Sequence, residues 1–170
     1  MKQPSHFLIG AASSGGGKTT FTTGLLRLFR DRGLNVQPYK CGPDYIDTKY
    51  HEMAAGNASV NLDLWLSSQK HVKETYAKYA AAMDVCVMGL FDGFEGMEGS
   101  SAAIAALLNI PVVLVINAKS TSYTVAPILY GFKYFNPSVR LAGVVFNQVA
   151  SERHYSFLQK ACEDVGVECF

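Results

Sequence analysis

The sequence has little charge and no excess of either sign. Its 170 residues include 15 Lys and Arg against 14 Asp and Glu, and only 17% of them are charged. A chain this close to neutrality lacks the broad basic surface of nucleic-acid-binding proteins, so we expect no nucleic acid as partner.

Long apolar segments are missing as well. The longest runs, such as Ile110 to Ile116, are far shorter than the roughly 20 residues that span a bilayer. The first residues do not read as a signal peptide, because the short apolar stretch after His6 soon becomes glycine-rich. We therefore expect a cytoplasmic protein without membrane contact.

Cysteine is scarce and forms no motif. The four cysteines include no Cys-x-x-Cys pair and no Cys/His spacing typical of a zinc site. Cys86 lies in a strand-like run and is expected to be a buried free thiol. None of the four has the surroundings of a nucleophile, and none is expected to hold a metal.

Hydrophobic residues make up 49% of the chain, which is enough for one buried core over residues 1–170. Apolar runs alternate with helical patterns, and this alternation predicts an α/β fold: a mostly parallel, doubly wound sheet flanked by helices. Ligands of such sheets bind beyond the carboxyl ends of the strands. Strands are expected at 6–9, 36–40, 85–88, 112–116, 143–146 and 167–170, and helices from about 19 to Gly33 and at 101–108, 122–134 and 151–165.

A glycine-rich loop between the first strand and the first helix is the strongest signal. Such a loop lets backbone N–H groups surround phosphate oxygens, and the following helix adds its positive end. Lys18 can reach the β- and γ-phosphates, and the Thr19 hydroxyl can bind Mg²⁺. The usual first glycine is replaced by Ala12, but the context still predicts a P-loop NTPase with ATP and Mg²⁺ as cofactors. The loop consists of Ser13, Ser14, Gly15, Gly16, Gly17, Lys18, Thr19 and Thr20.

Base recognition is less clear from the sequence. No strand is followed by the Asn/Thr-Lys-x-Asp pattern with which GTPases read guanine. Asn147 ends a predicted strand on the ligand side, where its amide could read adenine. A helix cap or a turn is an equally good interpretation of this residue.

Two acidic segments also follow predicted strands. Asp44 and Asp47 lie in a Gly-Pro turn, where they could hold Mg²⁺ or orient a substrate, or could be solvated turn residues. A second glycine-rich segment carries Asp92 and Glu95. His51 follows the first segment closely and could contact substrate, although a surface or capping position is the default for a histidine without metal spacing.

Taken together, these motifs resemble the cobyrinate a,c-diamide synthase family, within the dethiobiotin-synthetase-like P-loop proteins. The resemblance covers essentially all 170 residues. Asn61, Asp63 and Trp65 belong to it, although they could equally be a capped helix start with a buried indole. The segments that carry it are Ser13 to Thr20, Lys40 to Asp47, Asn61 to Trp65, Met88 to Gly93, Gly143 to Asn147 and Ser151 to His154.

The resemblance implies an enzyme of cobalamin biosynthesis that amidates the c and a acetate groups of cobyrinate with ATP and Mg²⁺. ATP phosphorylates a carboxylate, and ammonia then displaces the phosphate. Lys18, Asp44, Asp47 and Asp92 are the catalytic residues that it implies, and Thr19 with Asp44 or Asp47 the metal ligands. Glutamine supplies the ammonia in this family through a glutaminase domain, in cis in full-length members or in trans. A homodimer is compatible with the resemblance.

The sequence departs from the family pattern in two ways. No glutaminase domain is read within residues 1–170, and we expect these residues to form a single synthetase domain of a truncated chain. The family also typically has Glu-Gly-Val-Met between Val87-Met88 and Gly89, and the glutamate of that insert is the carboxylate expected near Mg²⁺. A nucleotide-binding but catalytically impaired chain is therefore one alternative.

Two other P-loop functions are alternatives. Another ATP-dependent carboxylate-activating enzyme, such as dethiobiotin synthetase, fits the P-loop, but Asp-Tyr-Ile-Asp and Leu-Phe-Asp-Gly count against it. A partitioning ATPase is the second alternative. Such proteins carry an extra lysine early in the loop, and this signature is absent here, because residues 11–14 are Ala-Ala-Ser-Ser.

Overall fold

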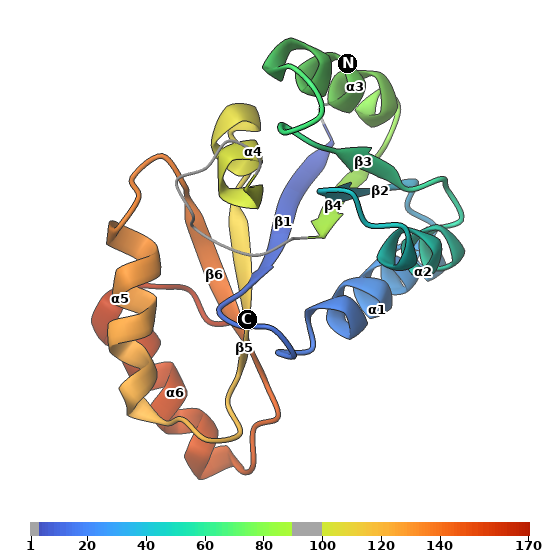
Figure 1. The fold of residues 1–170 in the computed structure, drawn as a ribbon. Helices are drawn as coiled ribbons and strands as arrows, with labels where there is room; N and C mark the ends of the chain where they lie inside the picture. Colours follow the sequence, from blue (N-terminus) through green and yellow to red (C-terminus); the bar gives the residue numbers. More distant parts are fainter. Residues whose placement is uncertain (1–3, 90–99) are drawn as a thin grey trace.

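A six-stranded parallel sheet forms the centre of the computed structural model (Figure 1), which describes residues 4–89 and 100–170. The strand order is β3-β2-β4-β1-β5-β6, and every neighbouring pair is parallel. This confirms the predicted fold class. The strands are β1 (Ser5–Ala11), β2 (Val36–Cys41), β3 (Val60–Leu62), β4 (Val85–Gly89), β5 (Val112–Asn117) and β6 (Leu141–Asn147).

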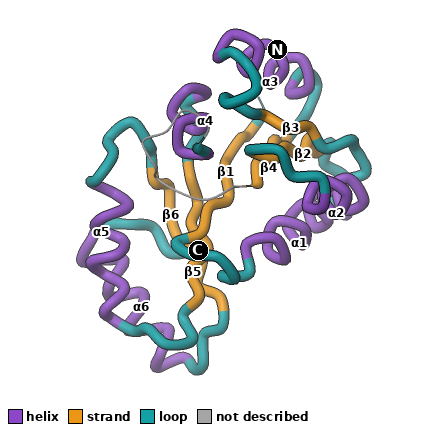
Figure 2. Tube along the Cα trace, viewed as in Figure 1, coloured by secondary structure: helices purple, strands orange, loops and turns teal. Residues whose placement is uncertain are grey.

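Helices cover both faces of this sheet (Figure 2). Successive strand residues point to opposite faces: Leu8 and Met88 join one buried cluster, and Ile9 and Val87 join another. The cluster around Ile9 is covered by α1 and α2, and the larger cluster by the remaining helices. The helices are α1 (Lys18–Asp31), α2 (Ile46–Ala55), α3 (Gln69–Ala80), α4 (Ser101–Leu108), α5 (Ala126–Tyr134) and α6 (Glu152–Val165).

Local capping signals explain several of the helix ends. Helix α1 stops at Asp31, and Gly33 follows with a φ of 78°, the left-handed conformation with which many helices end. Helix α6 begins after Ser151, whose hydroxyl accepts a hydrogen bond from the His154 N–H. Among the described residues, no helix is both long and apolar enough to cross a membrane.

Two predicted elements are wrong in type or extent. Residues 167–170 do not form a strand, because only one isolated bridge joins Cys169 to Val144. The predicted helix 122–134 divides into a 3₁₀ turn over Tyr123–Val125 and α5. Pro127 accounts for the division, since proline fits the first turn of an α-helix but not its interior.

The exposure of some aromatic side chains was not foreseen. Trp65 is 75% exposed, so the buried indole considered for it is wrong. Asp63 instead accepts hydrogen bonds from the backbone N–H groups of Trp65 and Leu66 and closes a turn.

Candidate functional site

The glycine-rich loop connects β1, at the middle of the sheet, to α1. Gly15 and Gly17 have φ angles of 75° and 89°, which residues with a Cβ rarely adopt. Gly17 is the N-cap of α1, and as a glycine it offers no side chain to cap that end of the helix. The first N–H groups of an α-helix have no partner within the helix, and in known phosphate-binding loops such groups bind the anion.

A cavity of about 370 Å³ lies over this loop. It brings together two segments that are far apart in the sequence, because β1 and β2 both deliver their carboxyl ends to the same edge of the sheet. The predicted residues Asp44 and Asp47 lie in the wall of the phosphate cavity. The cavity is lined by residues 13–20 together with Lys40, Asp44 and Asp47.

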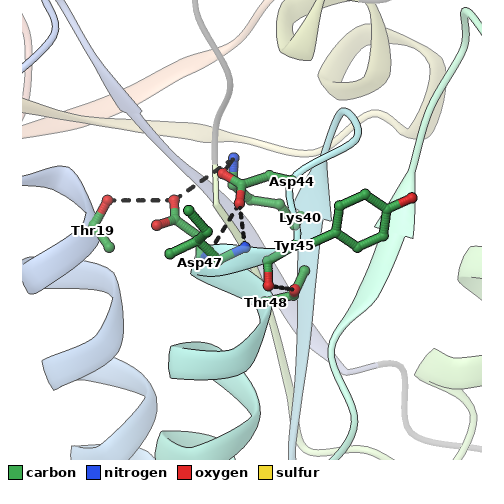
Figure 3. A network of polar contacts seen from close by, with 7 residues as sticks. Thr19, Lys40, Asp44, Tyr45, Asp47 and Thr48 are labelled. Atoms are coloured by element: carbon green, nitrogen blue, oxygen red, sulfur yellow. Dashed lines mark hydrogen bonds and ion pairs between the residues drawn. The ribbon is translucent and has the colours of Figure 1, made fainter.

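Polar contacts join the acidic turn, which carries Asp44 and Asp47, to the phosphate loop, residues 13–20 (Figure 3). The Thr19 hydroxyl donates to Asp47 Oδ2 at 3.4 Å. Lys40 Nζ lies 3.1 Å from Asp44 Oδ2 and 3.8 Å from Asp47 Oδ2. Asp44 Oδ1 accepts from the backbone N–H groups of Ile46 and Asp47 at 2.9 and 3.0 Å. Asp44 thus uses both oxygens within the protein, whereas Asp47 faces Thr19.

Lys40 is the functional candidate that the sequence analysis missed. It lies near the end of β2, where every residue is buried, and its own side chain is 2% exposed. A buried ammonium requires negative partners, and the two carboxylates supply them. The signal was present in the sequence, since Lys40 is the one charged residue in an otherwise uncharged strand.

The charge of Asp44 follows from this setting. Partial burial raises the pKa of its carboxyl group, but the Asp47 N–H and the Lys40 ammonium outweigh burial, and the net pKa is lowered. Asp44 is therefore ionised at neutral pH.

Asn147 lies on the other side of the phosphate loop from Asp44 and Asp47, because β2 and β6 lie on opposite sides of β1 in the sheet. Its Nδ2 donates to the carbonyl oxygen of Gly16 at 3.0 Å, and its Oδ1 accepts from the Gln148 N–H at 2.9 Å. The amide predicted to read adenine has a partner in the loop itself, and adenine recognition stays a prediction.

Residues 7–170 match the model of one protein family, the CobQ/CobB/MinD/ParA nucleotide binding domain. The chain belongs to this family. Its relatives include the hydrogenobyrinate a,c-diamide synthase of Streptomyces coelicolor, 46% identical over 95% of this chain. They also include the cobyrinate a,c-diamide synthase of Gloeobacter violaceus, 44% identical over 95%. The chain spans 35% and 37% of the length of these two relatives.

Solved structures of other P-loop proteins share the fold of this family member. The signal recognition particle 54 kDa protein of Aeropyrum pernix, in complex with GDP, superposes with a TM-score of 0.66 over 99% of this chain and 41% of its own. Chloroplast FtsY of Physcomitrella patens superposes with a TM-score of 0.64 over 99% and 58%. Their sequence identities are 16% and 15%, so they establish the fold alone.

Part of the predicted site cannot be placed. Asp92 and Glu95 lie outside the described residues. Met88 and Gly89, between which the four-residue difference from the family pattern falls, are described and are consecutive residues of β4. Within residues 4–89 and 100–170, no group of three or more His, Cys, Asp or Glu side chains could hold a metal ion. Any metal bound in the described part of the site would therefore need hydroxyl or ligand oxygens besides Asp44 and Asp47.

His51 lies in the interior of this family member, not at its surface. It is 1% exposed, and neither ring nitrogen has a hydrogen-bond partner among residues 4–89 and 100–170. A Cβ on Gly89 would come within 2.8 Å of its Cε1, which explains why β4 ends in glycine there. Burial, the largest effect, lowers the pKa of His51 below 6.5.

We expect this histidine to make folding sensitive to acid. Below pH 6.5 the unfolded chain binds a proton at His51 that the folded chain binds less readily. The free energy of unfolding therefore decreases as the pH decreases, by at most about 1.4 kcal/mol per pH unit for one proton. Between about pH 8 and pH 5.5, the free energy of unfolding measured with urea should decrease less for His51→Gln than for the wild type.

The matched control is His71→Gln, which changes an exposed histidine on α3 and should keep the wild-type slope. A residual slope is expected in all variants, because partial burial and Arg140 also lower the pKa of His6. Equal slopes for His51→Gln and the wild type would contradict the assignment.

Proposed function

We propose that this chain carries the ATP-dependent activation step of a corrinoid a,c-diamide synthase. Its substrate is cobyrinate or the cobalt-free hydrogenobyrinate, whose c and a acetate groups become amides in cobalamin biosynthesis. The observation that carries the proposal is the cluster of Lys40, Asp44 and Asp47 in the wall of the phosphate cavity. The names of the relatives at 44–46% identity support the substrate class.

The reaction has two steps. A carboxylate oxygen of the acetate group attacks the γ-phosphorus of ATP, the bond to the β-phosphate oxygen breaks, and ADP leaves. Ammonia then attacks the carbonyl carbon of the acyl phosphate, the C–O bond to phosphate breaks, and the nitrogen loses one proton, which leaves with the phosphate as the amide forms. Glutamine, hydrolysed by a glutaminase domain in cis or in trans, is the proposed source of ammonia.

The residues of the chain act mainly through charge and position. The loop amides and Lys18 hold the β- and γ-phosphates, and the Lys40 ammonium offsets negative charge where phosphate and carboxylate approach each other. Asp44 fixes the start of α2 through the Ile46 and Asp47 N–H groups, and so holds the acidic turn against the loop.

The oxygen atoms of Thr19 and Asp47 fit Mg²⁺. Their 3.4 Å separation joins two oxygen donors of the kind that Mg²⁺ prefers, next to the place for the phosphates. Bound there, Mg²⁺ would neutralise phosphate charge. We assign the metal contact to Asp47, because both carboxylate oxygens of Asp44 already contact other groups, Oδ1 two backbone N–H groups and Oδ2 the Lys40 ammonium.

Asp47→Asn should therefore raise the Mg²⁺ concentration for half-maximal ADP formation by about tenfold or more. The cause is the loss of an anionic oxygen donor. Asp44→Asn is the matched variant, and it should lower the rate with little change in that concentration. The assignment is wrong if Asp44→Asn alone shifts the Mg²⁺ requirement.

The test of the whole proposal is an amidation assay in which free ammonium replaces glutamine. The purified chain is incubated with MgATP and either cobyrinate or hydrogenobyrinate, and amides are detected by mass spectrometry. A variant with Glu-Gly-Val-Met inserted between Met88 and Gly89 runs in parallel. Amide from the native chain is the expected result. Amide from the extended variant alone would favour the impaired chain, and none from either would overturn the proposal.

A further inference from the structure

Asn147 connects two parts of the fold that the sheet keeps apart. It ends β6 at the edge of the sheet, and β5 separates that strand from β1. Its side chain nevertheless reaches the phosphate loop, 131 residues away in the sequence, where Nδ2 donates to Gly16 O at 3.0 Å. The Gln148 N–H occupies Oδ1. Because Gly16 O accepts only and the Gln148 N–H donates only, a single orientation of the amide satisfies both contacts.

This contact controls the direction of one peptide in the loop. In a trans peptide the carbonyl and the following N–H point to opposite sides. Holding Gly16 C=O toward Asn147 therefore turns the Gly17 N–H away from Asn147. A phosphate-binding loop depends on such orientation, since N–H groups must face the anion and carbonyl oxygens must not.

Gly17 fits closely against the same amide. It has a φ of 89°, and a Cβ at this position would overlap Asn147 Nδ2. Gly15 has a similar φ of 75°, but a Cβ there would meet nothing within 4 Å. The two glycines therefore share the backbone conformation, and only Gly17 is packed against Asn147.

We propose that Asn147 is a positioning residue for the phosphate loop. Its amide holds the Gly16–Gly17 peptide in the conformation that binds a triphosphate, whatever base the nucleotide carries. This inference rests on the nucleotide site of the proposed function and does not depend on the corrinoid substrate. Direct reading of adenine by Asn147 is the competing outcome.

A ligand without a base distinguishes positioning of the phosphate loop from direct reading of adenine. The dissociation constants of MgATP and of magnesium tripolyphosphate are measured by calorimetry for the wild type, Asn147→Ala and Asn147→Leu. We expect both variants to bind both ligands about tenfold more weakly, by equal factors. Weaker binding of ATP with unchanged tripolyphosphate binding would overturn the proposal, as would unchanged binding of both or a wild type that does not bind tripolyphosphate.

Asn117→Ala is the matched control. Asn117 is the register partner of Asn147, also ends its strand and is also half-buried. Its Oδ1 accepts from the Lys119 N–H and caps its own turn. Both dissociation constants should stay within about twofold of the wild type. Thermal unfolding midpoints of Asn147→Ala and Asn117→Ala should be similar, which separates a change in the loop from a general loss of stability.

A double-mutant cycle tests the contact itself. Gly17→Ala should weaken tripolyphosphate binding more in the wild type than in Asn147→Ala, where the methyl group meets no amide. Gly15→Ala should weaken binding by the same factor in both backgrounds. Equal factors for Gly17→Ala in both backgrounds would overturn the proposal. Loss of amidation with the expected binding pattern would instead overturn only the proposed function.

Discussion

Replacing Lys40 with methionine is expected to slow ADP formation in the presence of corrinoid substrate by roughly 100- to 1000-fold, the usual cost of removing one preorganised electrostatic group. Methionine keeps an unbranched apolar stem in the strand and removes only the ammonium. Without it, Asp44 and Asp47 lose their shared cation, and the negative charge that develops during phosphoryl transfer is no longer offset. The rate should fall more than the affinity for MgATP.

Lys49→Met is the control for this substitution. Lys49 follows the acidic turn within α2, but it is 77% exposed and pairs with Glu52 at 3.3 Å. A solvated pair of this kind contributes little, so activity should stay near that of the wild type. The role assigned to Lys40 fails if Lys40→Met keeps a rate within about threefold of wild type, a change worth less than 1 kcal/mol of barrier.

Replacing Lys18 with alanine is expected to cost about three orders of magnitude in kcat/KM, by analogy with other cations that contact a transferring phosphoryl group. Lys18 is the first residue of α1 and lines the phosphate cavity. Its ammonium adds a full positive charge to the partial charges of the loop amides, so its loss should weaken MgATP binding as well as turnover. This pattern differs from that of Lys40→Met, in which turnover falls more than binding.

Arg27→Ala is the matched variant on the same helix. Arg27 is 63% exposed and bonds only to Asp31 among the contacts described for it. Its removal leaves the cavity unchanged, and nucleotide binding should not shift. Wild-type MgATP affinity in Lys18→Ala would exclude this loop as the nucleotide site.

Much of the fold could be predicted because its signals are local. The buried strands β1, β2, β4, β5 and β6 read as short apolar runs, and their positions were predicted within a few residues. Helices α2 and α3 and strand β3 were missed. Strand β3 has only three residues, and α3 buries only Val72 and Ala80. Neither leaves a clear hydrophobic period in the sequence.

The sequence by itself determined the elements whose chemistry lies in consecutive residues: the phosphate loop, the acidic turn and the helix ends at Gly33 and Ser151. Backbone conformation and short-range spacing decide these features, so neighbouring residues are enough to predict them. Tertiary structure alone decided which distant groups meet. It buried Lys40 between two carboxylates, enclosed His51 beneath Gly89 and brought Asn147 to Gly16. These contacts depend on the order of parallel strands in the sheet, which no local pattern encodes.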